Sequence, residues 1–550
     1  MDWKLPLLSV VSLVVFFSIV EGLLWIAGVA TLFAESDPFQ GFSDQVRVYE
    51  LDARRNEYRT PRGATRSSFN PQSFAAEKPE NGFRLFALGG SSAYGFPWGA
   101  EVAFPRPLGD ALQASWPDRK IEAVNAGAMS YGSHRLRILT PELLGYEPDV
   151  LVIYGGHNEF VERGFYGELI DRLGELDQFR AVLYRSRIYS LMTRVYQGIS
   201  GGGGGVISEA EKEAEKRLLG LDVVRRDPVK VSEAERAEAR ARFEENIRAI
   251  LDLADAAGVT VVLCTVPSNR SRWAPNGSQY DSGLGLDARL EISDVIDQAE
   301  AALDASPVEG REAIELASAA LEQARSIAPG NAQVHYTLAR SYEALERWHE
   351  ARAAFILARD LDGSPWRAVS AINDTLRRVA EERDVLLVDV ERSFEAEAEH
   401  GLLGFNLFED YVHPKPEGHR LIAFELWRAM LEAGLGGPAR TADPADFWTV
   451  VGEARSQALA SDAEAPSAAA GARSAAQLYN LGIVLINQRR FEEAMENFVA
   501  CLELKPNHMG ARASLGSVLF NQGRYAEAAE QHQRVLQNRP DDPRSLIGLG

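Results

Sequence analysis

Apolar runs of strand length that alternate with helical segments constrain the fold of this chain more than any other feature. The runs lie at residues 83–88, 121–124, 148–154, 259–265 and 385–390. The helical segments between them lie around residues 104–114, 136–144, 240–257 and 366–382. Short apolar strands that alternate with helices form a parallel sheet covered by helices on both faces. The sequence therefore predicts a doubly wound α/β domain, in which ligands bind at the carboxyl ends of the strands.

Serine, amide, histidine and carboxylate groups stand where these strands end. Ser91 follows two glycines at the end of the first strand. The second strand ends in Asn125-Ala126-Gly127, and the third is followed by Asn158. Asp410 precedes His413 by three residues near the end of the α/β pattern. Such a carboxylate orients the imidazole ring, while the other ring nitrogen takes the proton of a serine hydroxyl.

These four blocks, in this order, resemble those of the SGNH (GDSL-type) hydrolase superfamily. The resemblance covers about residues 82–162 and 236–435. It implies a flavodoxin-like α/β/α sandwich and a serine esterase that needs no metal and no organic cofactor. Gly90 stands where the superfamily usually has aspartate, and the third block ends in Glu159 in place of aspartate. Neither substitution removes a group of the triad or of the oxyanion site.

The resemblance also implies a role for each residue of the blocks. Ser91 is the expected nucleophile, His413 the general base and Asp410 the carboxylate that orients it. The expected oxyanion donors are the backbone N–H groups of Ser91 and Gly127 and the side-chain amide of Asn158.

Three residues after the fourth strand are candidates for the wall of a substrate pocket. Asn269, Arg270 and Trp273 follow this strand at the same edge of the sheet. Packing of the loop explains these residues equally well, so both interpretations stay open. His157 and His419 lie near the candidate triad in the sequence, and we expect structural roles for both.

The expected activity is cleavage of carboxylic (acyl or acetyl) esters through a covalent acyl-enzyme. Two alternatives remain open. A hydroxyl of an exported polysaccharide could replace water as the acyl acceptor, because the triad and the oxyanion groups serve both reactions. The chain could instead be a scaffold with a vestigial hydrolase domain, although a scaffold has no need of Ser91, Asp410 and His413 together.

An apolar run at the amino terminus predicts a membrane anchor. Residues 5–33 contain one charged side chain, Glu21, and about 20 apolar residues span a bilayer. Small residues near the end of the run also fit a signal-peptide cleavage site, but the run is longer than the about 7–15 apolar residues of such peptides. Lys4 precedes the run, while Glu35 and Asp37 follow it. Positive charge stays cytoplasmic, so we expect a single-pass anchor in the cytoplasmic (inner) membrane with the catalytic domain on the periplasmic, extracytoplasmic side.

The carboxyl-terminal region, residues 475–550, repeats with the tetratricopeptide period. Leu515-Gly516 follows Leu481-Gly482 by 34 residues, the period of this repeat. The same step reaches Leu549-Gly550, so we expect a third, truncated repeat. Stacked helix pairs form a concave surface suited to peptides or partner helices, and we therefore expect an unidentified protein partner there.

A second helical repeat interrupts the α/β pattern. Residues 298–362 carry small and large side chains at tetratricopeptide positions, which predicts a helical insert within a hydrolase domain of residues 82–435. Residues 456–474 are rich in Ala and Ser and are expected to form a linker.

Charge and cysteine content exclude further classes. Acidic residues outnumber basic ones by 79 to 58, and the net charge of −21 disfavours nucleic acid as the main partner, because phosphate binding draws on clustered Lys and Arg. Cys264 and Cys501 are the only cysteines. They cannot form a cysteine-rich zinc site, and we expect two buried small apolar residues.

Overall fold

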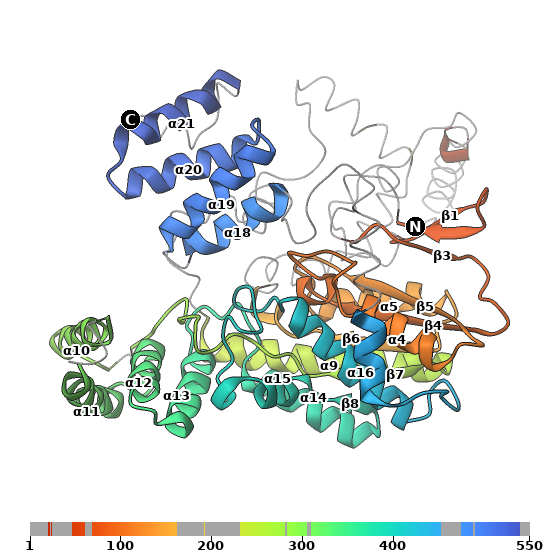
Figure 1. Ribbon diagram of the computed structural model, residues 1–550, viewed down its shortest axis with the longest axis horizontal. Coiled ribbons are helices and arrows are strands. Elements are labelled where there is room, and N and C mark those ends of the chain that lie inside the picture. Colours follow the sequence, from red (N-terminus) through yellow and green to blue (C-terminus); the bar gives the residue numbers. More distant parts are fainter. Residues whose placement is uncertain are drawn as a thin grey trace, which may run out of the picture.

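A computed structural model of the 550-residue chain shows the arrangement of its elements (Figure 1). The structure describes residues 20–22, 24, 47–60, 69–161, 187, 192, 231–280, 283–304, 310–452, 475–487 and 490–538. The expected linker, residues 456–474, and the expected start of a third repeat at 549–550 lie outside the described residues.

Five parallel strands form the central sheet. Their bounds are β4 (Gly82–Gly89), β5 (Lys120–Gly127), β6 (Val150–Tyr154), β7 (Thr260–Cys264) and β8 (Leu386–Val388). The strand order is β5-β4-β6-β7-β8, which is 2-1-3-4-5 in chain order, the flavodoxin-like doubly wound arrangement. The strands β4 and β6 are buried along their whole length, as strands of a parallel sheet covered on both faces should be. The predicted α/β fold is confirmed.

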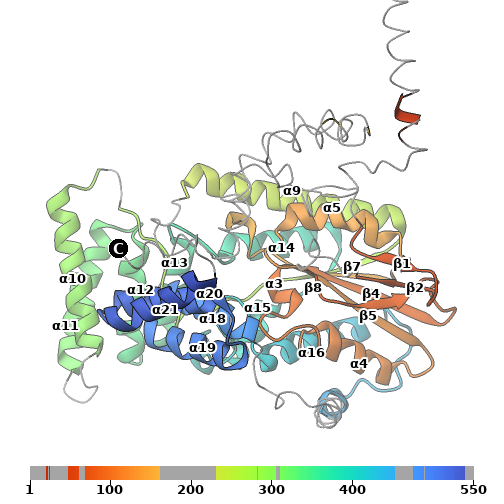
Figure 2. The same ribbon diagram turned by 90° about the horizontal axis from the view of Figure 1, so that it is seen from above.

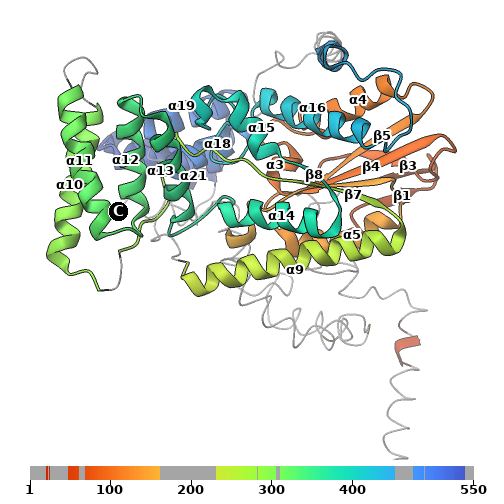
Figure 3. The ribbon, with the colours of Figure 1, turned by 90° about the horizontal axis from the view of Figure 1, so that it is seen from below.

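Helices cover both faces of this sheet, and the three layers are visible edge-on in Figures 2 and 3. One face carries α4 (Pro105–Ser115) and α16 (Pro416–Glu432). The other carries α5 (Ser133–Leu144), α9 (Glu233–Ala257) and α14 (Ser370–Arg383). A single hydrophobic core joins the sheet to both helical layers, and Cys264 is buried in it.

A small antiparallel sheet precedes the central one and was not predicted. It consists of β1 (Glu50–Asp52), β2 (Glu57–Arg59) and β3 (Ser73–Ala75). Strands of three residues are too short to show a period of two in a sequence. Phe74 of β3 packs edge-on against Phe86 of β4, with ring centroids 5.3 Å apart, and so ties the small sheet to the main core.

Four helices lie between β7 and α14 and form the helical insert, seen at the far left of Figure 3. Their bounds are α10 (Leu286–Asp304), α11 (Arg311–Ile327), α12 (Ala332–Ala344) and α13 (Trp348–Asp360). These helices share a hydrophobic cluster of their own. The insert therefore begins twelve residues before the predicted position 298, because α10 carries buried apolar residues at Ile292 and Ile296.

The carboxyl-terminal helices pack as two pairs around a separate core. Their bounds are α18 (Ala475–Asn487), α19 (Phe491–Leu504), α20 (Met509–Asn521) and α21 (Tyr525–Asn538). A Cβ at Gly482 would meet the ring of Phe498 at 2.5 Å, and one at Gly516 would meet the ring of His532 at 2.8 Å. The repeated glycine thus lets the second helix of each pair approach the first. Cys501 is buried in this core, so both cysteines are buried, as predicted.

Only residues 20–22 and 24 of the expected anchor, residues 5–33, are described, and they lie in a helix. Among the residues that the structure describes, no helix combines the length and the apolar content that a membrane crossing requires. The carboxylate of Glu21 accepts a hydrogen bond of 2.5 Å from the backbone N–H of Arg187. Its oxygen also lies 3.8 Å from the guanidinium of that residue.

Candidate active site

The turn after β4 carries Ser91, which begins the short helix α3 (Ser91–Tyr94). The two glycines before it are required by close contacts. A Cβ at Gly89 would lie 2.0 Å from the carbonyl oxygen of Tyr154, and one at Gly90 would lie 2.3 Å from the amide nitrogen of Asn158. The sequence thus permits a sharp strand-to-helix turn that places Ser91 at the carboxyl edge of the sheet.

Asp410, His413 and Ser91 form one hydrogen-bonded chain. The distance between His413 Nε2 and Ser91 Oγ is 2.7 Å, and that between His413 Nδ1 and Asp410 Oδ2 is 2.6 Å. The exposed fractions are 9% for Ser91, 4% for His413 and 1% for Asp410. The hydroxyl, the imidazole and the carboxylate are therefore within hydrogen-bonding reach of one another and shielded from bulk water, the arrangement that activates a serine nucleophile.

The loop that carries Asp410 and His413 is held by its own backbone and by the nucleophile turn. Asp410 Oδ1 accepts the backbone N–H groups of Val412 and His413, each at 2.9 Å. Ser92 Oγ donates to the carbonyl oxygen of Val412 at 3.0 Å. The spacing of three residues thus lets one carboxylate close the turn and orient the ring. The neighbouring hydroxyl of Ser92 is occupied with a structural bond.

Asn158, the predicted oxyanion donor, lies beside the turn that carries Ser91. Its Nδ2 donates to the carbonyl oxygen of Tyr131 at 2.9 Å. A primary amide has two N–H groups, so this bond fixes the side chain and leaves one donor. The same Nδ2 is the atom that a Cβ at Gly90 would strike, which places it next to Ser91.

The backbone N–H of Gly127 was predicted to be an oxyanion donor, but in the structure it has another role. Its backbone N–H donates to Asn125 Oδ1 at 2.9 Å, so this amide already has a partner. A Cβ at Gly127 would lie 2.4 Å from the backbone nitrogen of Tyr94. The glycine is therefore explained by the close approach of α3 to the end of β5, and its N–H, bonded to Asn125, is not available as the predicted oxyanion donor.

Asn269 packs against the catalytic loop and has no exposed surface. Its Nδ2 donates to the carbonyl oxygen of Asp410 at 3.0 Å, and its backbone N–H donates to the carbonyl oxygen of Tyr411 at 3.0 Å. The side chain is therefore used within the protein. The packing interpretation of this residue holds, and the substrate-contact interpretation does not.

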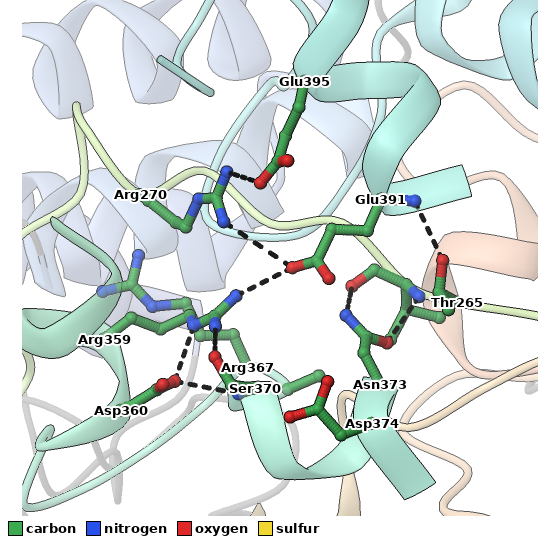
Figure 4. A network of polar contacts seen from close by, with 12 residues as sticks. Thr265, Arg270, Arg359, Asp360, Arg367, Ser370, Asn373, Asp374, Glu391 and Glu395 are labelled. Atoms are coloured by element: carbon green, nitrogen blue, oxygen red, sulfur yellow. Dashed lines mark hydrogen bonds and ion pairs between the residues drawn. The ribbon is translucent and has the colours of Figure 1, made fainter. Parts of the chain in front are cut away.

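Arg270 and Trp273 are buried in the same loop, each 3% exposed. Figure 4 shows the guanidinium of Arg270 directed at two carboxylates of the helix α15 (Val390–Glu397). Its distance is 2.5 Å to Glu395 and 3.6 Å to Glu391. The ring of Trp273 lies 5.0 Å from that of Tyr411. The guanidinium of Arg270 is thus paired within the protein, and Trp273 packs on the ring of the residue that follows Asp410.

Buried charge continues from Arg270 into the helical insert (Figure 4). Arg359, at the end of α13, lies 3.2 Å from Glu391 and donates to Ser370 Oγ at 2.6 Å. Burial opposes ionisation of Glu391, yet the guanidinium groups of Arg359 and Arg270 hold the pKa of its carboxyl below the ordinary value. A paired charge network therefore joins the insert to α14, to α15 and to the loop that carries Arg270.

Two further histidines near the site are buried and uncharged. Burial, with a smaller contribution from His413, lowers the pKa of His157 to about 3 and that of His419 to about 3. His157 Nδ1 accepts the backbone N–H of Ala368 at 3.2 Å. Neither ring nitrogen of His419 has a hydrogen-bond partner among the described residues. These surroundings agree with the structural roles predicted for both.

Replacing His419 should reduce the sensitivity of the fold to acid. The folded ring stays neutral down to a pKa of about 3, whereas the unfolded ring binds a proton below about pH 6.5. The contribution of His419 to the free energy of unfolding is therefore fully present above pH 6.5. It falls as the pH falls, by about 2 kcal/mol at pH 5. His419→Leu should remove this loss, measured as the change in unfolding free energy between pH 7.5 and pH 5. The exposed His349→Leu is the control, and an equal pH dependence in both variants would contradict the assignment.

Comparisons with known proteins agree with the two-part organisation. Residues 479–543 match the family model of the tetratricopeptide repeat, which confirms the predicted repeats. No curated protein matches the sequence.

Solved structures similar to this chain include esterases and a lipase. An acetylxylan esterase of Geobacillus stearothermophilus is 12% identical with a TM-score of 0.30, over 64% of this chain and 96% of that one. An acetyl xylan esterase named AlAXEase is 12% identical with a TM-score of 0.29, over 63% and 99%. A GDSL-like lipase of Bacteroides thetaiotaomicron is 11% identical with a TM-score of 0.26, over 64% and 88%.

Because the identities and TM-scores of these structures are low, the fold is assigned from the strand order of the sheet. The chain joins an α/β domain with the flavodoxin-like strand order to carboxyl-terminal tetratricopeptide repeats.

Proposed function

We propose that this protein is a serine hydrolase that cleaves carboxylic (acyl or acetyl) esters. The observation that carries the proposal is the chain of hydrogen bonds from Asp410 through His413 to Ser91, at 2.6 and 2.7 Å. Ser91 Oγ attacks the ester carbonyl while His413 Nε2 takes the hydroxyl proton. Asp410 holds the ring and stabilises the imidazolium.

The negative charge of the tetrahedral intermediate falls on the former carbonyl oxygen. The backbone N–H of Ser91 and the remaining amide N–H of Asn158 are the donors that we assign to it. His413 then returns its proton to the departing alcohol. A water molecule, deprotonated by the same ring, attacks the acyl-enzyme and releases the acid.

Reaction with a fluorophosphonate tests the proposal. The purified chain should form one phosphonyl adduct, and mass mapping should place it on Ser91. Ser92→Ala is a matched control, because Ser92 is the adjacent serine and its hydroxyl is bonded to Val412. This variant should still be labelled on Ser91. An unlabelled wild-type chain would favour the scaffold alternative over an enzyme.

The same covalent step permits transfer to another acceptor. If a hydroxyl of a polysaccharide replaces water, added glycan should become acylated, and release of free acid should fall by the same amount. Product analysis with and without glycan therefore separates a hydrolase from an O-acyltransferase. We expect free acid in both cases.

Asn158→Ala should lower kcat by about 10²–10³ with little change in KM. The donor matters in the transition state, where the oxygen is negatively charged, far more than in the bound ester. The lost bond to Tyr131 could instead loosen the loop. Thermal melting on the same preparation distinguishes the two. A large fall in melting temperature with near-normal kcat in the folded fraction would show that the amide is only structural.

We further propose that residues 5–33 anchor the protein in the cytoplasmic (inner) membrane, with the hydrolase domain on the periplasmic side. The support is the apolar run with Lys4 before it and Glu35 and Asp37 after it. Protease added to intact spheroplasts should degrade the hydrolase domain, and protection behind a sealed membrane would reverse the orientation. The repeats at residues 479–543 suit a protein partner in the same compartment.

A further inference from the structure

The segment that returns from the helical insert to the sheet, residues 361–369, is fixed against the loop after β7. We call it the return segment. The carboxylate of Asp362 accepts the backbone N–H groups of Asn276, Gly277 and Ser364, at 2.9, 3.0 and 3.0 Å. Gly363 N donates to the carbonyl oxygen of Gly277 at 2.7 Å. The segment is thus a fixed part of the fold rather than a loose connection.

Arg367 of the return segment contacts residues 269–273, the part of the chain next to the loop of Asp410. Its side chain is 1% exposed. One guanidinium nitrogen, Nη1, donates to the carbonyl oxygen of Asn269. The other, Nη2, donates to that of Trp273 at 3.1 Å. A buried guanidinium therefore holds both ends of one five-residue loop through its backbone.

Asn269 connects the loop held by Arg367 to the loop that carries Asp410 and His413. Its backbone N–H and its side-chain amide hold the carbonyl oxygens of Tyr411 and Asp410, each at 3.0 Å. Its Oδ1 accepts the backbone N–H of Arg272 at 3.0 Å, so both polar groups of the side chain are used. The carbonyl of Asp410 is thereby fixed on one side while its carboxylate holds His413 on the other.

We propose that Arg367 and Asn269 are positioning residues for the triad, and that the return segment is part of the active-site structure. The inference rests on the proposed function, because it gives Asp410 and His413 their roles. A carboxylate that orients a general base tolerates a displacement of only about 0.5 Å. A misplacement of about 1 Å costs about 10²-fold in rate. A residue that fixes the backbone of Asp410 therefore acts on kcat without touching the ester.

The test compares Arg367→Met with Arg359→Met. Both residues are arginines 1% exposed, at the base of the same insert. Arg359 bonds to Glu391 and Ser370 and makes none of the bonds to residues 269–273 that Arg367 makes. We expect kcat on a short-chain aryl ester to fall by about 10²-fold in Arg367→Met with KM within about twofold. Arg359→Met should lower the melting temperature and should reduce kcat much less than Arg367→Met does.

Two further variants separate positioning from simple destabilisation. Arg367→Lys keeps one donor for the carbonyl of Asn269 and should recover most of kcat. The single variant Asn269→Ala should lower kcat. The double variant Asn269→Ala/Arg367→Met should lose much less kcat than the product of the two single fold-losses, because both residues act on one loop. Active-site titration with fluorophosphonate counts the competent serines, so kcat refers to folded enzyme only.

The outcomes distinguish this inference from the function on which it depends. Equal losses of kcat in Arg367→Met and Arg359→Met, or independent effects in the double variant, would overturn the positioning roles while the esterase stands. A wild-type chain that neither hydrolyses esters nor binds the probe would overturn both.

Discussion

Ser91→Ala should leave a folded protein without measurable hydrolysis of short-chain aryl esters. The alanine keeps the turn after β4, because the backbone of Ser91 and not its hydroxyl forms the first turn of α3. It removes the atom that attacks the carbonyl. The loss in kcat should be about 10⁶-fold, the size found when the serine of a comparable triad is removed. Initial rates on titrated enzyme, with melting temperature measured in parallel, check this.

The control for this variant is again Ser92→Ala. Its side chain bonds to the catalytic loop and not to His413, so its loss should reduce turnover modestly. Hydrolysis at the wild-type rate in Ser91→Ala would rule out the serine mechanism. Loss of all activity in Ser92→Ala, with labelling of Ser91 retained, would show that Ser91 is the nucleophile and that the bond from Ser92 to Val412 is essential for turnover.

Asp410→Asn should lower kcat by about 10⁴-fold with the loop intact. The amide oxygen can keep the two backbone bonds that Asp410 Oδ1 makes to Val412 and His413. The amide nitrogen then faces His413 Nδ1, which must accept instead of donate. The other ring nitrogen now carries the proton and cannot take one from Ser91.

Asp410→Asn should change the tautomer of His413 without changing the stability of the fold. Because the backbone bonds survive, its melting temperature should stay close to that of the wild type, and KM should change little. Asp410→Ala loses those bonds and should melt lower. A small effect of Asp410→Asn on kcat would mean that another group orients the ring.

The sheet and the pairing of Asp410 with His413 could be predicted because their signals are local. The strands β4 and β6 consist mostly of apolar residues and are buried at all of their positions. Asp410 and His413 lie within one turn, so their contact follows from spacing alone. The amide partner of Gly127 is just as local, but the choice between a free donor and a bond to Asn125 depends on the rotamer of that side chain.

The positions of Arg270 and Arg367 could not be predicted from spacing. A charged side chain in a loop is expected to be exposed. Arg270 is buried because Glu395, 125 residues later, supplies its partner. Arg367 reaches Asn269 across 98 residues and the whole helical insert. Such pairings are created by the fold, and no single segment encodes them.

The place of the insert also has a consequence for how the chain folds. The strand β8 pairs with β7 between Leu386 and Val262, and helices α10–α13 lie between them in the chain. Closing so long a loop is slow when the intervening chain is flexible. Helices that pack locally form earlier and shorten the path between its ends. The triad, which needs β8 in place before Asp410 and His413 can reach Ser91, should therefore assemble late, and variants that destabilise the insert should lengthen the lag before newly made protein becomes active.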